Sequence, residues 1–129
     1  MVVKIAHKVI MRNSSIHGLG VFAKEVICEG EIIEECPVLP LPSEHRMAFP
    51  DYSFKHNHNT YSDGVFTETI PLGYGCIYNH SDQNNATWFF DVKKNTCKFI
   101  ALRDIEVGEE ICTNYGEGYW KNHPNIERR

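Results

Sequence analysis

The sequence predicts a mainly β protein built from many small strands. Short apolar stretches alternate with Gly, Asn, Asp and Pro, and no long stretch repeats its apolar residues at helical spacing. A twelve-residue pattern also occurs twice, once in each half of the chain. The 129 residues are enough to bury one hydrophobic core. We therefore expect a single domain over residues 1–129.

The expected strands follow apolar or alternating stretches, and the turns between them follow glycine and asparagine. The strands are expected at residues 2–11, 21–23, 31–36, 65–69, 88–92, 97–101 and 111–113. Turns are expected at Glu29-Gly30, Asp63-Gly64, Lys94-Asn95 and Val107-Gly108. Four prolines between positions 37 and 50 leave room for a short helix at most, at residues 43–48.

The repeated pattern relates residues 22–33 to residues 100–111. The same residue type occurs in both copies at five offsets, namely 23/101, 27/105, 30/108, 31/109 and 33/111. Each copy reads as a strand, a turn whose glycine can take a positive φ, and a second strand. The repeat predicts two similar hairpin-like units in a pseudo-symmetric β architecture, although five matches in twelve also fit chance and shared strand chemistry.

Composition and charge exclude several classes of protein. No run of eighteen apolar residues or basic-then-apolar leader occurs, so we expect neither a membrane span nor a signal peptide. Five widely spaced cysteines without a Cys-x-x-Cys pair argue against zinc and against a disulfide framework, and favour an intracellular compartment. The net charge of −4 argues against direct nucleic-acid binding. It suits a basic partner, or simply solubility.

Two polar motifs are candidates for ligand contact. His17-Gly18-Leu19-Gly20 places two glycines where backbone amides can approach a ligand, but a plain turn is the more common reason for a lone Gly-x-Gly. Asn79-His80 offers an amide and an imidazole from one tight loop, and its structural alternative is an Asx-type turn.

A third candidate is the aromatic stretch near the C-terminus. Tyr115, Tyr119 and Trp120 lie in a glycine-containing segment, where aromatic walls suit a flat cofactor or a cation. The structural alternative is an aromatic anchor that packs on the sheet. Metal binding by His80 is not favoured, because a zinc site needs three or four ligands. It is not favoured for His56 and His58 either, which lie in a polar loop.

Taken together and in this order, the motifs resemble the SET-domain lysine methyltransferases along nearly the whole chain. The matching segments are Gly18-Leu19-Gly20, Asn79-His80-Ser81, Gly108-Glu109-Glu110-Ile111 and Tyr115-Gly116. Glu34-Glu35-Cys36, residues 51–54 and Tyr119-Trp120 further resemble the minimal stand-alone members, of the chlorella-virus type and the compact bacterial type. The resemblance implies a β-clip of several small sheets, with a knot-like crossing formed by the Asn-His-Ser segment and the C-terminal strand.

The resemblance also implies roles for individual residues. Tyr115 and Tyr52 would be the catalytic tyrosines. The cofactor S-adenosylmethionine would be held by His17, Gly18, Leu19, Gly20, Asn79, His80, Tyr115 and Trp120. The channel for the substrate lysine would be lined by Tyr52, Trp88, Thr113 and Tyr119. Leu19 departs from the viral relative, which has an aromatic residue there, and Asn84-Asn85 stands where Pro-Asn is usual. No metal is expected, because the flanking cysteine-rich segments of many relatives are missing.

The implied activity is methylation of a lysine side chain in a protein with S-adenosylmethionine as donor. A basic histone tail is the favoured substrate, and a non-histone protein is the alternative. The sequence is also compatible with a catalytically degenerate SET fold that binds peptides, and with a small β domain that has a structural role. The resemblance allows a homodimer and implies a soluble intracellular protein, in a host nucleus if viral and in the cytoplasm if bacterial.

Overall fold

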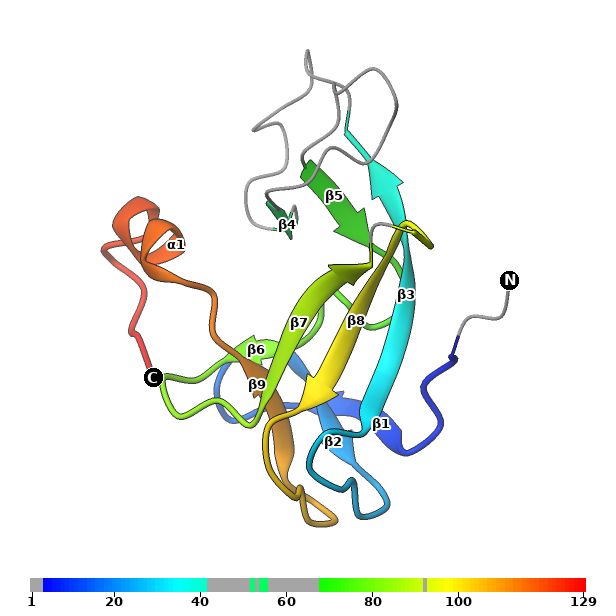
Figure 1. The fold of residues 1–129 in the computed structure, drawn as a ribbon. Helices are drawn as coiled ribbons and strands as arrows, with labels where there is room; N and C mark the ends of the chain where they lie inside the picture. Colours follow the sequence, from blue (N-terminus) through cyan, green and yellow to red (C-terminus); the bar gives the residue numbers. More distant parts are fainter. Residues whose placement is uncertain (1–3, 42–51, 53, 56–67, 92) are drawn as a thin grey trace.

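The computed structural model describes residues 4–41, 52, 54–55, 68–91 and 93–129. These residues form two small sheets and one short helix (Figure 1). The mainly β architecture of several small strands expected from the sequence is confirmed. All five cysteines are free. Within the described part of the chain, no helix is long and apolar enough to cross a membrane.

The first sheet has four strands in the order β1-β2-β9-β6. Its strands are β1 (Val9–Asn13), β2 (Leu19–Ala23), β9 (Glu110–Thr113) and β6 (Asn79–His80). β1 and β9 pair antiparallel with β2, whereas β6 runs parallel to β9, with Asn79 opposite Cys112 and His80 opposite Thr113. The sheet therefore brings the Gly-x-Gly, Asn-His and Tyr115 segments to one region.

The second sheet has five strands in the order β4-β5-β3-β8-β7. Its strands are β4 (Phe54–Lys55), β5 (Glu68–Pro71), β3 (Ile32–Pro40), β8 (Thr96–Ala101) and β7 (Ala86–Asp91). All neighbours are antiparallel. The strand β3 alternates apolar and polar residues only in part, and a register shift between Ile32 and Glu34 interrupts its pairing with β8. The core between the sheets is apolar and includes Val21, Ile27, Phe99, Ile105 and Ile111, each 0% exposed.

The repeated sequence pattern corresponds to a local two-fold arrangement, in which equivalent positions of the two copies pair with each other. Ile27 and Ile105 exchange both backbone hydrogen bonds, at 3.0 and 2.8 Å. The Ala23 amide donates to the Glu109 carbonyl and the Ala101 amide donates to the Glu31 carbonyl, both at 3.0 Å. The two turn glycines take φ values of 81° and 90°. The prediction that each copy is a hairpin-like unit is wrong, because β2 pairs with β9 and β3 pairs with β8, so the strands before and after each glycine turn lie in different sheets.

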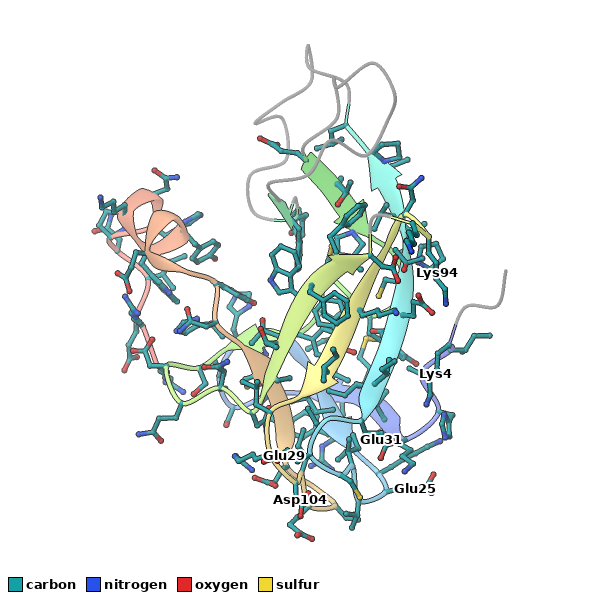
Figure 2. All side chains as sticks on the ribbon, viewed as in Figure 1. Lys4, Glu25, Glu29, Glu31, Lys94 and Asp104 are labelled. Atoms are coloured by element: carbon teal, nitrogen blue, oxygen red, sulfur yellow. The ribbon has the colours of Figure 1, made fainter. Side chains whose placement is uncertain are left out.

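Acidic residues cluster where these two turns meet. Figure 2 shows Glu29 and Asp104 near each other at that end of the molecule. The Asp104 carboxylate accepts a 2.8 Å hydrogen bond from the Glu29 amide. Glu31 and Glu109 occupy the same position in the two copies of the repeat. Their carboxylates accept hydrogen bonds from the amides of Cys28 and Glu106, at 3.2 and 2.6 Å. These carboxylates close the turns, which lie well apart from helix α1 (Glu117–Asn122) in Figure 1.

Of the strand expected at residues 2–11, the part at residues 4–8 is wrong, because β1 begins at Val9, and residues 2–3 lie outside the described residues. The Lys4 carbonyl accepts a 2.8 Å hydrogen bond from the Glu35 amide, and the Lys4 amide donates to the Glu35 carboxylate. The chain is thus attached to β3 before it joins β2 through β1. A segment that passes from one sheet to the other cannot continue as one strand.

The sequence pattern did not predict helix α1. The helix has six residues, none of them buried, and glycines lie at its N-cap and second position. It is therefore too short and too irregular to show an apolar period. The helix expected at residues 43–48, the turn at 63–64 and the histidines at 56 and 58 lie outside the described residues.

Candidate active site

The central residue of the candidate site is Tyr115, two residues after the end of β9. Its amide donates a 2.9 Å hydrogen bond to Nδ1 of His80, and its hydroxyl donates a 2.6 Å hydrogen bond to the Tyr78 carbonyl. Two of its groups are therefore fixed by the residues on either side of Asn79. The residue as a whole remains 37% exposed, so part of it is accessible to a ligand. Burial of the hydroxyl raises the pKa of Tyr115, so the phenol stays protonated at neutral pH.

The carbonyl that receives the Tyr115 hydroxyl belongs to a rigid residue. Tyr78 is 2% exposed, and its ring stacks on Phe99 with centroids 4.5 Å apart. Its hydroxyl donates a 2.6 Å hydrogen bond to the Glu34 carboxylate. Packing and this hydrogen bond hold the Tyr78 side chain, which restrains the position of its carbonyl.

His80 has a defined hydrogen-bond arrangement. Its Nδ1 accepts from the Tyr115 amide, so Nδ1 carries a lone pair. The hydrogen then resides on Nε2, which lies 2.7 Å from the Asp82 carboxylate. His80 is thus neutral in this arrangement, because a proton on Nδ1 would face the amide hydrogen of Tyr115.

The Gly-x-Gly segment is attached to this centre through Asn79. The Asn79 amide nitrogen lies within hydrogen-bond distance of the carbonyls of His17 and Leu19, at 3.0 and 3.2 Å, and of the Glu110 carboxylate, at 2.8 Å. Glu110 also accepts a 2.6 Å hydrogen bond from the Ser14 hydroxyl. These contacts fix the carbonyls of His17 and Leu19, on either side of Gly18, against the Asn79 side chain.

Glycine is needed at positions 18 and 20 for different structural reasons. Gly18 takes a φ of 46°, and a Cβ built on it would meet nothing within 4 Å. A Cβ on Gly20 would instead collide with the Glu110 carboxylate. Gly20 therefore makes room for Glu110, whereas Gly18 leaves open space beside exposed His17 and Leu19.

Aromatic rings cover the other side of His80. The centroid of Trp120 lies 4.7 Å from that of His80, and the centroid of Tyr119 lies 4.7 Å from that of Tyr115. Tyr119 and Trp120 are themselves 5.0 Å apart. These four rings form a continuous aromatic wall between β9 and α1. The Trp120 indole N–H is buried and has no hydrogen-bond partner in the described part of the protein.

The remaining predicted site residues lie at different places. Thr113 is buried on β9 opposite His80. Trp88 packs edge-on against Phe54, with centroids 4.8 Å apart. Tyr52 is 55% exposed, and its carbonyl lies 3.5 Å from the Cys76 thiol. The structure thus brings His80, Tyr115, Tyr119 and Trp120 into contact and connects the Gly-x-Gly segment to them through Asn79. The roles of all the predicted site residues stay predictions.

Sequence reasoning did not assign roles to several residues that build the site. Tyr78 supplies the carbonyl for Tyr115, Glu110 organises the Gly-x-Gly segment, and Asp82 receives His80. Asn85 contributes as well, because its side chain donates to the Glu110 carbonyl and accepts from the Cys112 amide, both at 2.9 Å. The segment from Asn79 to Asn85 therefore contacts β9 at both of its ends. The knot-like crossing itself stays a prediction. The sequence signal that could have indicated Asn85 and Glu110 is their position as polar residues directly before apolar strand residues. In the structure Asn85 is buried and Glu110 is half-buried.

No group of three or more His, Cys, Asp or Glu side chains that could hold a metal ion occurs within the described ranges.

Comparison with known proteins decides the family. The SET domain family model matches residues 18–116. The chain belongs to the SET domain family. A Schizosaccharomyces pombe histone-lysine N-methyltransferase, specific for H3 lysine-37, is 33% identical over 110 residues, which cover 85% of this chain and 74% of the yeast protein. A crystal structure of a Plasmodium falciparum protein described as a candidate histone methyltransferase has a TM-score of 0.71 and 33% identity, covering 90% of this chain and 99% of that one.

These relationships confirm the resemblance read from the motifs and place the chain among the protein-lysine methyltransferases. The matched SET region begins at Gly18 and ends at Gly116. It therefore contains Asn79, His80 and Tyr115, whereas helix α1 and the residues after it lie beyond its end.

Proposed function

We propose that this SET protein transfers a methyl group from S-adenosylmethionine to the ε-amine of a lysine in a basic protein segment. The observation that carries the proposal is the joint position of Tyr115 and His80. One three-residue segment makes all the connecting contacts: the Tyr78 carbonyl accepts from the Tyr115 hydroxyl, the His80 ring accepts from the Tyr115 amide, and the Asn79 side chain donates to the Gly-x-Gly segment. A methyl-transfer centre needs such a meeting of cofactor and substrate groups, because alignment supplies much of the rate enhancement.

The residues present fit the proposed cofactor. The buried Trp120 indole N–H lacks an acceptor in the described structure, which an adenine nitrogen or another ligand acceptor would provide. The open space at Gly18 lets backbone approach a ligand closely. His17, Gly18, Leu19, Gly20, Asn79, His80, Tyr115 and Trp120 are the residues proposed to hold it. When bound, S-adenosylmethionine would supply an electrophilic methyl group on a sulfonium.

The chain's own residues would orient the methyl transfer rather than provide a strong base. A free lysine has a pKa of ~10.4 and is protonated at neutral pH. Aromatic walls such as Tyr115 and Tyr119 would desolvate the amine and favour its neutral form, with water as proton acceptor. The Tyr115 phenol donates its hydrogen to Tyr78, so its oxygen keeps lone pairs for weak CH···O contacts. Its raised pKa makes it unsuitable as a general base.

A histone tail is the substrate class we favour. The net charge of −4 suits a basic partner, and the yeast and Plasmodium relatives are both described as histone methyltransferases. A histone substrate would require the protein to reach chromatin inside the cell. The proposal includes no nucleic-acid contact and no membrane, and a homodimer stays a prediction. Catalysis by this single chain, over residues 1–129, is part of the same proposal.

The test is transfer of labelled methyl groups from S-adenosylmethionine to a panel of core histones and to total cell extract. Labelling of a histone by the wild-type protein, lost in the Tyr115→Phe variant, would support the proposal. Labelling of non-histone proteins alone would redirect it to another substrate. Calorimetric binding of S-adenosylmethionine without any labelling would favour a peptide-binding module, and no binding would overturn the cofactor assignment.

A further inference from the structure

Helix α1 has few internal interactions that could stabilise it. It has six residues, no buried residue and no side-chain cap at its N-terminal Gly116. A helix this short is marginal in water, and its position must come from tertiary contacts. Two of these contacts are aromatic, through Tyr119 and Trp120. A third comes from the chain after the helix, which runs back beside the loop between β6 and β7 (Figure 1).

Arg128, in this returning segment, binds two acidic residues. Its Nε lies 2.7 Å from the Asp82 carboxylate, and its two terminal nitrogens lie 3.0 and 2.8 Å from the two oxygens of Glu117. Glu117 is the first residue of α1, so one guanidinium joins the helix to the loop after β6. The guanidinium also lies 5.6 Å from the centre of the Trp120 ring. Such a fork geometry suits Arg and cannot be reproduced by Lys.

The same oxygen of Asp82 that binds Arg128 also faces His80. Oδ1 is 2.7 Å from His80 Nε2 and 2.7 Å from Arg128 Nε. The Asp82 carboxylate is 48% exposed, whereas the His80 side chain is 3% exposed. Arg128 therefore reaches, through one carboxylate, a buried imidazole whose other nitrogen binds the Tyr115 amide. Both hydrogen-bonding sites of the His80 ring are then specified.

We propose that Asp82 and Arg128 are positioning residues for the methyl-transfer site. They fix His80 as its Nε2–H tautomer and hold Trp120 against it, so that the cofactor face of the site is formed before ligand binding. Neither residue contacts reacting atoms in this proposal. It rests on the proposed function for its effect on turnover, but its structural part concerns His80 alone and can be tested without substrate.

The expected effect is on cofactor affinity more than on the chemical step. Replacing Arg128 by Gln removes the ion pairs with Asp82 and Glu117, but leaves Tyr115, Tyr78 and their hydrogen bond unchanged. We expect the KM for S-adenosylmethionine to rise about fivefold to tenfold, the size of a charge-assisted hydrogen-bond network at a half-exposed site, with kcat within about twofold. Arg128→Lys should lie between the wild-type protein and Arg128→Gln, because Lys can reach only one of the two carboxylates.

The matched control is Arg103→Gln. Arg103 also forms a surface ion pair, with Glu109 at 3.2 Å, but it lies on the loop between β8 and β9 and not beside α1. Its loss should leave the KM for the cofactor unchanged.

The double variant Asp82→Ala with Arg128→Gln should raise KM little more than the larger of the two single effects, because both substitutions break the same contact.

The second readout is the tautomer of His80 in the protein without ligand. Two-bond ¹H–¹⁵N NMR spectra, assigned with the His80→Ala variant, should show the Nε2–H tautomer in the wild-type protein. Asp82→Ala should shift the tautomer population or broaden the His80 signals, while Asp82→Asn, which keeps an acceptor, should restore them. Unchanged His80 signals in Asp82→Ala, or an unchanged KM in Arg128→Gln, would overturn the proposal. Altered His80 signals in a protein that transfers no methyl group would leave the positioning role intact and count against the proposed function instead.

Discussion

The Tyr115 hydroxyl donates a 2.6 Å hydrogen bond to the carbonyl oxygen of Tyr78. Tyr78 in turn donates a 2.6 Å hydrogen bond to Glu34, whose side chain is almost completely buried. The phenol proposed to be catalytic is thus connected to the core of the second sheet through one backbone carbonyl. The direction of this hydrogen bond leaves lone pairs on the Tyr115 oxygen, which suits orientation of a polarised methyl group.

Stability should depend on pH through Glu34. Burial is the largest effect on this group and raises its pKa, in spite of the hydrogen bond from Tyr78. A raised pKa in the folded state means that the stabilising contribution is present below the unfolded value and is lost as pH rises through the folded value. We therefore expect Glu34→Gln to become more stable relative to the wild-type protein as pH rises from about 4 to 8, because only the wild-type protein has a carboxyl that must ionise in a buried position. Thermal melts across this range would measure the shift.

The control for this prediction is Glu25→Gln. Glu25 is exposed on the connection between β2 and β3, as Figure 2 shows, and the substitution makes the same change in charge. If Glu25→Gln and Glu34→Gln show the same dependence on pH, then burial of Glu34 is not the cause and the interpretation is wrong.

Asn79 should be needed both for folding and for cofactor binding. Asn79→Ala removes the amide that the carbonyls of His17 and Leu19 share with the Glu110 carboxylate. Because a half-buried carboxylate loses a partner, we expect a loss of about 1–3 kcal/mol in unfolding free energy. Weaker binding of S-adenosylmethionine should accompany it, since the Gly-x-Gly segment is then released. Calorimetry of this variant, with exposed Asn122→Ala as control, measures the two effects.

Unchanged cofactor affinity in Asn79→Ala would reduce the Asn-His motif to a structural turn. His80→Ala provides an independent check, because it removes the acceptor of the Tyr115 amide. We expect it to lower both the melting temperature and the cofactor affinity.

The protein should act without a bound metal. Treatment with a chelator should change neither the melting temperature nor the methyltransferase rate, since the sequence lacks the paired cysteine motifs of zinc sites. Elemental analysis of the purified protein provides the measurement. Zinc present in a stoichiometric amount would contradict the prediction.

The β architecture could be predicted from the sequence because its determinants are local. Strand residues alternate or are continuously apolar, and the turn glycines Gly30 and Gly108 occupy positions that require a positive φ. The repeated pattern also indicated that two distant segments are related, and Ile27 and Ile105, at equivalent offsets, pair with each other in the structure. Tyr115 and His80 were found because their motifs occur in the order that the family shares.

The connections within the site could not be predicted in the same way. Arg128 and Asp82 are far apart in sequence, and both are ordinary surface residue types with no periodic signal. Helix α1 has neither the length nor the apolar face that marks a helix in sequence. The attachment of Lys4 to β3 before β1 begins depends on tertiary packing rather than on local preference.

The measurement that tests the central claim most directly compares Tyr115→Phe with the wild-type protein in labelled-methyl transfer from S-adenosylmethionine to histones. The substitution removes one hydroxyl and its hydrogen bond to Tyr78, while the ring and its aromatic contacts stay. We predict that the melting temperature changes little and that kcat falls by at least about a hundredfold, the scale of losing one positioned polar group. A variant that keeps a rate near that of the wild-type protein would contradict the assignment of Tyr115 as the catalytic residue.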